Sequence, residues 1–315
     1  MCELADVRDA ARRIAPYLPQ TAFRRYPALS DLVGAEVWVK HENQLPTNAF
    51  KVRGGVNLVS RLSDGEKERG LVTASTGNHG QSIAFASRLF GVRATICVPE
   101  RANPVKVGAI RALGAEIVVH GVDFDEAREH CERLAAEHGY RYVHSGNEPH
   151  LIAGVGTAVL ELLEAEPGID VIVVAVGGGS GAAGACVVAK ALRPATEVIG
   201  VQSEAAPAAY RSWREAAIAE DRMGTAAEGL ATRVGFELPQ RILREHLDDF
   251  VLVSEQELQE ATLAMIAGTS NLCELAAAAP LAAALRLRDR LEGRRVALIQ
   301  SGANISLDQL RELFR

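Results

Sequence analysis

The sequence predicts an α/β protein made of two doubly wound lobes with mainly parallel sheets. Two observations favour this fold class. Short runs rich in Val, Ile and other apolar residues alternate with longer amphipathic stretches along the chain, and the short runs are almost continuously apolar. Strands of this kind are typical of parallel sheets that helices cover on both faces.

The predicted elements alternate in chain order. The expected strands are the runs at 36–40, 71–75, 94–99, 116–120, 142–145, 171–177, 197–202, 250–254 and 296–302. The expected helices are the amphipathic stretches at 79–89, 123–138, 151–165, 181–192, 255–267 and 272–289. Parallel neighbours need a crossover connection, and these helices are long enough to supply one.

The order of the elements predicts a small lobe inserted into a larger one. The strand and helix units of residues 70–145 would form a small α/β domain, and residues 1–69 and 146–315 would form the large domain. Open parallel sheets bind ligands beyond the carboxyl ends of their strands, so we expect the binding cleft to lie between the lobes.

Composition excludes several classes of protein. The 315 residues carry 34 basic and 40 acidic side chains, for a net charge of -6, with no basic stripe for nucleic acid and no polybasic patch for a membrane surface. No segment reaches the roughly 20 apolar residues of a membrane span, and the first residues do not match a signal peptide. The 5 cysteines lack a CxxC pair. We therefore expect these cysteines to be reduced thiols in the cytoplasm.

A lone lysine stands out in "NAFKVRGG", residues 48–55. Lys51 falls in the first turn of an expected helix, between Phe50 and Val52. An amine can attack an aldehyde only when it is uncharged, and apolar neighbours favour that state. The alternative is an ordinary solvated lysine.

Polar and glycine-rich segments follow three of the expected strands. "VGGGSGAAGA" (176–185) opens a helix, so Gly177, Gly178, Gly179, Ser180 and Gly181 would direct backbone N–H groups at an anion, most simply a phosphate. A glycine turn that only permits close packing is the alternative. No Walker lysine follows, and GxGxxG spacing fits only loosely.

The segments "STGNHGQ" (75–81) and "SGANIS" (301–306) complete the set. The first offers hydroxyl, amide and imidazole groups together with free N–H groups of a first helical turn, which suits a carboxylate. Its alternative is a plain N-cap with His79 solvated on the helix surface. The second alone would be only a turn.

In this order, the motifs resemble the fold type II family of pyridoxal-phosphate enzymes, whose fold is like that of tryptophan synthase β. Within it they are most similar to the threonine dehydratase and serine racemase branch. The resemblance runs from about residue 15 to residue 306. It rests on "KHENQLPTNAFKVRGG", "TASTGNHGQS", "PHLIAGVGT", "VGGGSGAAG" and "SGAN".

The resemblance implies pyridoxal 5'-phosphate as cofactor and a role for each matching residue. Lys51 would form the Schiff base with it and act as a base, and Gly177–Gly181 would hold its phosphate. Asn78 would contact the ring 3-hydroxyl and Ser301 the pyridine nitrogen. The substrate carboxylate would bind at Ser75, Thr76, Gly77 and His79.

A serine facing the pyridine nitrogen favours β-elimination. Unlike an aspartate, Ser301 cannot keep that nitrogen protonated, so prolonged negative charge on the ring is disfavoured. We therefore expect an ammonia-lyase that dehydrates and deaminates a β-hydroxy amino acid such as L-threonine or L-serine. Racemisation or β-replacement, as in serine racemase or cysteine synthase, is the alternative. Racemising relatives carry serine where Thr76 stands, and threonine is stiffer at χ1.

Other assignments remain open. A nucleotide-binding oxidoreductase or a non-catalytic binding module is a further alternative, and the sequence does not identify the substrate side chain. Segments 145–152 and 224–234 are candidates for its pocket, and Arg53, Arg222 or Arg233 for binding a second carboxylate, against surface roles as the default. Glu274 is either a site residue or part of a core helix.

The remaining expectations concern metal, assembly and regulation. Glu228 matches an acidic position near which some relatives bind a divalent cation, but one carboxylate makes a weak site, and no zinc spacing is present. The chain ends 14 residues after Ser301, so we expect no C-terminal regulatory domain. The resemblance implies a homodimer.

Overall fold

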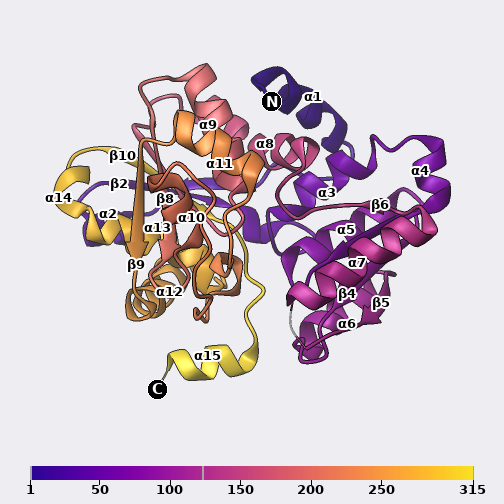
Figure 1. The fold of residues 1–315 in the computed structure, drawn as a ribbon. Coiled ribbons are helices and arrows are strands. Elements are labelled where there is room, and N and C mark those ends of the chain that lie inside the picture. The colour runs from indigo at the N-terminus through magenta and orange to yellow at the C-terminus, as the bar shows by residue number, and fades with distance from the viewer. Residues whose placement is uncertain (1, 123, 315) are drawn as a thin grey trace.

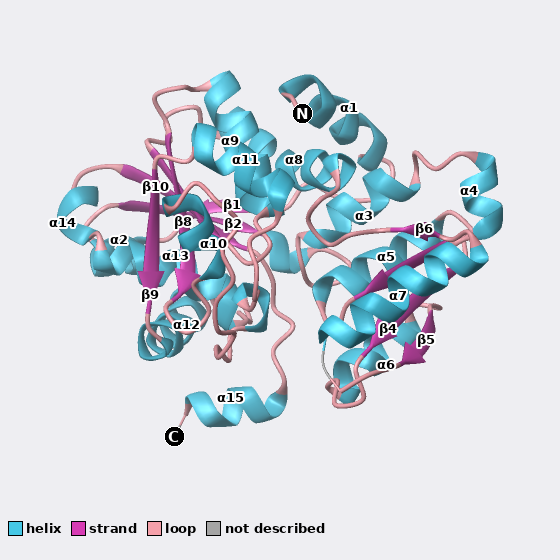
Figure 2. Cartoon of the chain, viewed as in Figure 1, coloured by secondary structure: helices cyan, strands magenta, loops and turns pink. Residues whose placement is uncertain are grey.

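Two separate sheets organise the chain (Figures 1 and 2). The structure, a computed structural model, describes residues 2–122 and 124–314. One sheet has six strands and the other has four. All neighbouring strands are parallel except β1 and β2, so the predicted class of two mainly parallel sheets is confirmed.

The six-stranded sheet has the order β1-β2-β10-β7-β8-β9. Its strands are β1 (Phe23–Arg25), β2 (Glu36–His41), β7 (Val171–Ala175), β8 (Glu197–Ser203), β9 (Asp249–Val253) and β10 (Arg295–Gln300). The register pairs Val296 with both Val37 of β2 and Val171 of β7, so the last strand of the chain, β10, lies between two strands that come before it. Only the short edge strand β1 was not predicted.

The four-stranded sheet has the order β5-β4-β3-β6. It consists of β3 (Leu71–Ala74), β4 (Ala94–Val98), β5 (Glu116–Val119) and β6 (Arg141–Tyr142). The prediction of a strand at 142–145 is wrong in its bounds. Val143 still donates its N–H to Val72, but His144 and Ser145 leave the sheet and line a cavity.

Helices cover both sheets (Figure 2). They are α1 (Leu4–Ile14), α2 (Pro27–Val33), α3 (Lys51–Val59), α4 (Asp64–Arg69), α5 (Asn78–Leu89), α6 (Pro104–Ala112), α7 (Phe124–His138), α8 (Pro149–Ala165), α9 (Ser180–Leu192), α10 (Ala208–Arg214), α11 (Glu237–His246), α12 (Glu255–Thr269), α13 (Leu275–Arg286), α14 (Arg288–Leu291) and α15 (Leu307–Leu313), with 3₁₀ turns η1 (Glu42–Gln44) and η2 (Glu228–Leu230). The stretch predicted as one helix at 272–289 is α13 and the start of α14. Residue 123, the first of the predicted helix 123–138, lies outside the described residues.

Strand β7 shows why the six-stranded sheet forms. Ile172 and Val174 point into a core with α8, α9 and α11, whereas Val171 and Val173 point into a second core with α12 and α13. A strand buried on both faces has to be apolar at every position, which is why its sequence runs without alternation. The carboxyl end of β7 is thereby fixed between two packed layers.

Helix α3 is held tightly between α8 and α5, and glycines make this possible. A Cβ on Gly154 of α8 would lie 2.6 Å from the Arg53 carbonyl oxygen, and one on Gly55 of α3 would lie 2.3 Å from the Ser82 hydroxyl of α5. Ser82 also donates a hydrogen bond of 2.6 Å to the Lys51 carbonyl. The start of α3 therefore has little freedom to move.

A buried ion cluster lies behind α3. The Arg53 guanidinium donates to both oxygens of Glu42, at 2.6 and 2.9 Å, and to both oxygens of Glu161, at 2.6 and 2.9 Å. Lys40 donates to Glu161 at 2.5 Å, and Thr21 donates to Glu42 at 2.7 Å. Two cations thus balance two carboxylates, as buried charges require. Arg53 is engaged here and does not line the cavity.

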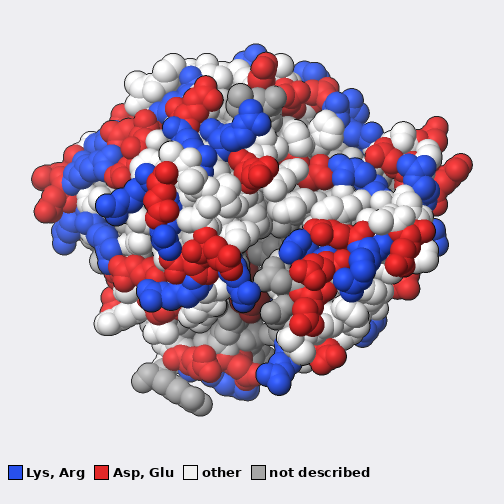
Figure 3. Space-filling model, viewed as in Figure 1, with Lys and Arg blue, Asp and Glu red and all other residues white. Residues whose placement is uncertain are grey.

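The surface carries both signs of charge. Figure 3 shows acidic and basic side chains interspersed over the visible face, with no broad area of one sign. In the part of the chain that the structure describes, no helix is both long enough and apolar enough to span a membrane.

Candidate active site

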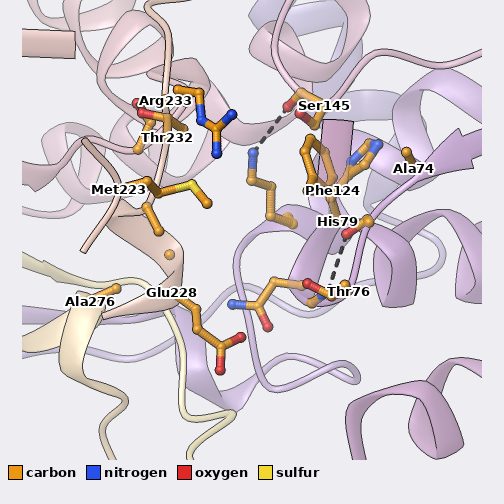
Figure 4. Close-up of a pocket in the computed structure, with 18 of the residues that line it drawn as sticks. Ala74, Thr76, His79, Phe124, Ser145, Met223, Glu228, Thr232, Arg233 and Ala276 are labelled. Atoms are coloured by element: carbon orange, nitrogen blue, oxygen red, sulfur yellow. Dashed lines mark hydrogen bonds between the residues drawn. The ribbon is translucent and has the colours of Figure 1, made fainter. Parts of the chain in front are cut away.

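A cavity of about 1140 Å³ lies where strands of both sheets end. Part of its lining is shown in Figure 4. Residues after β3, β7 and β10 line it, as expected for the carboxyl ends of parallel strands. Every residue to which the resemblance assigned a contact with the cofactor or the substrate carboxylate lines this cavity: Lys51, Ser75, Thr76, Gly77, Asn78, His79, Gly177, Gly178, Gly179, Ser180, Gly181 and Ser301.

Lys51 is partly buried in this cavity, and its amine binds protein atoms rather than being an ordinary solvated lysine. Its Nζ donates to Ser180 Oγ at 2.9 Å and to the Ser145 carbonyl at 3.2 Å, the latter drawn in Figure 4. Burial lowers the pKa of Lys51 to about 8, because removal from water disfavours the charged form. About a tenth of the amine is therefore uncharged at pH 7, far more than for a free lysine, and attack on an aldehyde requires this form.

The glycine loop lies directly beside this amine. Gly179 has φ 85, and α9 starts at the next residue, Ser180, whose hydroxyl accepts the bond from Lys51. A Cβ on Gly177 would lie 2.2 Å from the Gly229 carbonyl oxygen, and one on Gly178 would lie 2.2 Å from the Phe236 ring. Only glycine fits there, and the N–H groups that open α9 form a receptor for an anion such as phosphate.

The segment after β3 turns sharply into α5. Ser75 Oγ accepts hydrogen bonds from the Gly77 N–H at 3.2 Å and from the Gly80 N–H at 2.9 Å. This serine thereby holds the loop in shape while Thr76, Gly77 and Asn78 line the cavity. The first turn of α5 supplies further N–H groups for a carboxylate.

His79 is not solvated on the helix surface. Thr73 Oγ1 donates to the Val143 carbonyl at 2.6 Å, so it accepts from His79 Nε2 at 3.0 Å, which places the imidazole proton on Nε2. Burial is the main cause that lowers the pKa of His79 to about 3. The ring is neutral at physiological pH, so its side chain brings no positive charge to a carboxylate.

Ser301 directly follows β10, and a backbone hydrogen bond holds it in place. Its carbonyl accepts the Phe50 N–H at 2.9 Å, which ties it to the residue before Lys51. The side chain is buried at the edge of the cavity. The lysine, the glycine loop and this serine thus come together from α3, β7 and β10.

Sequence reasoning missed one residue that orients the cavity wall. His144 Nδ1 accepts from the N–H groups of Gly146 and Asn147, both at 3.0 Å. The centroids of the His144 and Phe236 rings lie 4.7 Å apart in an edge-to-face arrangement. Burial lowers the pKa of His144 to about 4. The only sequence signal was its place near a strand end, beside the segment at 145–152.

Lys106 was missed as well, because its partner is distant in the sequence. It donates to Glu228 at 2.6 Å, and both residues line the cavity from opposite lobes. Glu228 is labelled in Figure 4. Glu228, the residue that the sequence suggested for a divalent cation, is thus already bound by Lys106. The described residues contain no group of three or more His, Cys, Asp or Glu that could hold a metal ion.

The substrate-side segments were anticipated in part. Ser145 and Asn147, and most of residues 226–234, line the cavity. Arg233 lies there too, and Figure 4 labels it beside Thr232. Arg222 instead donates to the Glu204 carbonyl at 3.2 Å, outside this lining. Of the three arginines considered, only Arg233 lines the cavity.

Comparison with known proteins agrees with this geometry. The chain is 37% identical over 311 residues to an L-threonine ammonia-lyase of Thermotoga maritima, covering 98% of this chain and 77% of that one. It is 35% identical over 309 residues to an L-threo-3-hydroxyaspartate ammonia-lyase of Saccharomyces cerevisiae, covering 98% and 95%. The fold matches the crystal structure of serine racemase from Dictyostelium discoideum with a TM-score of 0.92 and 33% identity, covering 97% and 99%.

A family model named "Pyridoxal-phosphate dependent enzyme" matches residues 14–302, which include all the residues that the resemblance assigned to the cofactor and to the substrate carboxylate. The chain therefore belongs to the pyridoxal-phosphate dependent enzyme family.

Proposed function

We propose that this enzyme eliminates the β-hydroxyl group of a β-hydroxy amino acid and releases a 2-oxo acid and ammonia. The observation that carries the proposal is the partly buried Lys51 amine, which lies 2.9 Å from the hydroxyl of Ser180, the first residue of α9 after the glycines. Relatives named for L-threonine and L-threo-3-hydroxyaspartate ammonia-lyase activity support this class of reaction.

The residues present fit pyridoxal phosphate. When bound, this cofactor supplies an aldehyde for an amine and a ring that withdraws electrons from the substrate α-carbon. Lys51 would hold the aldehyde carbon, and the glycine loop, which can pack against Gly229 and Phe236 only because Gly177 and Gly178 lack a Cβ, would hold the phosphate through its N–H groups. Asn78 would contact the ring oxygen and Ser301 the ring nitrogen.

Lys51 is also suited to move the α-proton. Its pKa of about 8 lies near neutral pH, so the amine can accept a proton from carbon and give it up again. Ser180 Oγ and the Ser145 carbonyl hold the Nζ on one side of the cavity. The N–H groups after β3, shaped by Ser75, would orient the substrate carboxylate.

Ser301 favours elimination over transamination. A neutral hydroxyl cannot form an ion pair with a protonated ring nitrogen, so negative charge that develops at the α-carbon is only weakly stabilised. Prompt departure of the β-hydroxyl avoids that charge. Thr76, with its stiff χ1, argues against a second acid/base on the opposite face, although the likeness to a serine racemase keeps racemisation as the alternative reaction.

Product analysis tests the reaction. Purified protein loaded with pyridoxal phosphate is incubated with L-threonine, L-serine and L-threo-3-hydroxyaspartate, and ammonia, 2-oxo acid and D-amino acid are measured. We expect ammonia and 2-oxo acid in equal amounts from at least one substrate, and none of either from Lys51→Ala. Accumulation of D-amino acid without ammonia would make the racemase alternative the correct one.

Further expectations join this proposal. We propose a homodimer in the cytoplasm, with 1–69 and 146–315 as the large domain and 70–145 as the small one. All five cysteines are unpaired and buried, which supports a reducing compartment. The four-stranded sheet lies within 71–142, in support of the boundaries, although its core also includes Val52 and Val56.

A further inference from the structure

Glu274 stands at the start of α13 but does not cap it. It is the N-cap residue, a position at which a side-chain oxygen usually accepts N–H groups of the first turn, yet its side chain makes no such bond. The carboxylate instead lines the active-site cavity. It accepts Asn78 Nδ2 at Oε1, at 2.9 Å, and the Asn304 N–H at Oε2, at 3.0 Å.

Asn304 closes this network from the other side. Its Nδ2 donates to the Thr47 carbonyl at 2.9 Å and to Asn78 Oδ1 at 2.7 Å. A backbone carbonyl only accepts hydrogen bonds, so the amide of Asn304 can have only this orientation. Both of its N–H groups are then used, and Asn78 has to present its oxygen to Asn304.

The orientation of the Asn78 amide follows from these contacts. Its oxygen faces Asn304, so its nitrogen faces Glu274, as an acceptor-only carboxylate requires. One of the two hydrogens on Nδ2 binds Glu274, and one remains. Because Asn78 lines the cavity, that remaining hydrogen is a donor for a bound molecule.

We propose that Glu274 and Asn304 are positioning residues that hold the Asn78 amide with its nitrogen, not its oxygen, toward the cofactor. The inference rests on the proposed contact between Asn78 and the ring oxygen next to the aldehyde carbon. A fixed donor there stabilises negative charge on that oxygen. An amide free to flip would present a repelling oxygen part of the time.

The backbone around Glu274 is built for this placement. The Glu274 N–H donates to the Gly302 carbonyl at 3.2 Å, and a Cβ on Gly302 would lie 2.9 Å from Glu274 Oε1. Glycine at 302 therefore leaves the space in which the carboxylate reaches Asn78. Burial raises the pKa of Glu274, whereas Lys106 and the hydrogen bonds from Asn78 and Asn304 favour its charged form and Glu228 opposes it. Both of its oxygens accept N–H groups, as the carboxylate form requires.

The visible absorption of the lysine-linked cofactor is the readout. Holoenzyme is titrated with pH for the wild type and for Glu274→Ala, Glu274→Gln and Asn304→Ala. We expect the midpoint between the two absorption bands to rise by roughly 0.5 to 1 pH unit in Glu274→Ala and Asn304→Ala, as loss of one hydrogen bond to the ring oxygen implies. Glu274→Gln keeps one of the two contacts and should lie between.

Glu228→Gln is the matched control. It removes a neighbouring carboxylate from the same cavity without touching Asn78, so its midpoint should equal that of the wild type. The proposal is overturned if both alanine variants titrate as the wild type does, or if Glu228→Gln moves as far as they do. If Glu274→Ala does not fold, the titration midpoints of Asn304→Ala and Glu274→Gln test the proposal in its place.

This outcome is independent of the reaction. A wild-type holoenzyme with a lysine-linked band but no release of ammonia would refute the proposed elimination and leave the titration interpretable. Conversely, a normal lyase whose variants show unshifted bands would refute only the positioning role.

Discussion

At the scale of single residues, removal of the Lys51 amine from water lowers the free energy of unfolding. The pKa of this lysine falls from 10.5 to about 8, so below pH 8 the folded chain keeps a charge that water would solvate better. The unfolded chain binds more protons between these values, so stability rises with pH across that window. The cost is complete below pH 8 and disappears above 10.5.

Lys51→Met should therefore stabilise the cofactor-free protein. At pH 7 we expect a gain of up to roughly 3 kcal/mol in the free energy of unfolding, because the pKa of this lysine falls to about 8 on folding. The difference should shrink toward pH 10. Denaturant unfolding at the two pH values measures it. Lys67→Met, at a lysine side chain that is 40% exposed, is the control. An equal gain for Lys51→Met at both pH values would contradict this origin.

Ser301 makes a second prediction at this scale. Ser301→Asp places a carboxylate beside the position proposed for the ring nitrogen, which would keep that nitrogen protonated and stabilise negative charge for longer. We expect slower ammonia release and more transamination, measured as the fraction of cofactor recovered in its amine form per 2-oxo acid formed. Ser301→Ala, which adds no charge, should leave that fraction low. An unchanged fraction in the aspartate variant would remove the argument from Ser301.

Individual residues also mark the limit of sequence reasoning. Lys51 and the glycine loop were predictable, because their chemistry is visible in a few consecutive letters. The Asn78–Asn304 and Asn78–Glu274 contacts were not, since their partners lie 226 and 196 positions apart. His79 shows the same limit: its segment was recognised, but the partner Thr73 that fixes its tautomer was not.

At the scale of elements, hydrophobic patterning predicted best where both faces of a strand are buried. β7, β8 and β10 belong to this class, and each was predicted. β1 was not predicted and β6 was predicted with wrong bounds, because strands of three and two residues are too short to show a hydrophobic pattern. α13 begins at Leu275, since the backbone before it is tied to the Gly302 loop and not to a helical turn.

The buried ion cluster fixes α3, and with it Lys51, against α8. Arg53→Met would leave Glu42, whose side chain is 0% exposed, without its main partner. Removing one member of a buried pair costs about 3 to 5 kcal/mol, and we expect that loss in the free energy of unfolding by denaturant. Arg12→Met, which breaks an ion pair of a side chain that is 72% exposed, should cost under about 1 kcal/mol. Equal losses of unfolding free energy in the two variants would show that the buried ion cluster does not stabilise the position of α3.

At the scale of the whole molecule, the cavity is shared between two lobes, so their relative position matters for turnover. Lys106 of α6 and Glu228 of η2 reach each other from opposite lobes, 2.6 Å apart, with side chains 12% and 44% exposed. A partly exposed pair contributes about 0.2 to 1 kcal/mol. Its effect on kcat/KM should thus be at most about fivefold, because 1.4 kcal/mol corresponds to tenfold.

A double-mutant cycle measures this link between the lobes. Lys106→Met and Glu228→Gln should each lower kcat/KM by up to about fivefold, and the double variant should lose no more than the larger single loss, because the second change removes a partner already missing. Added salt should lower wild-type kcat/KM toward the variants' value by screening the pair. Losses that simply multiply in the double variant would mean that each side chain acts on the substrate alone. The two lobes would then be positioned by their packed helices, not by this contact.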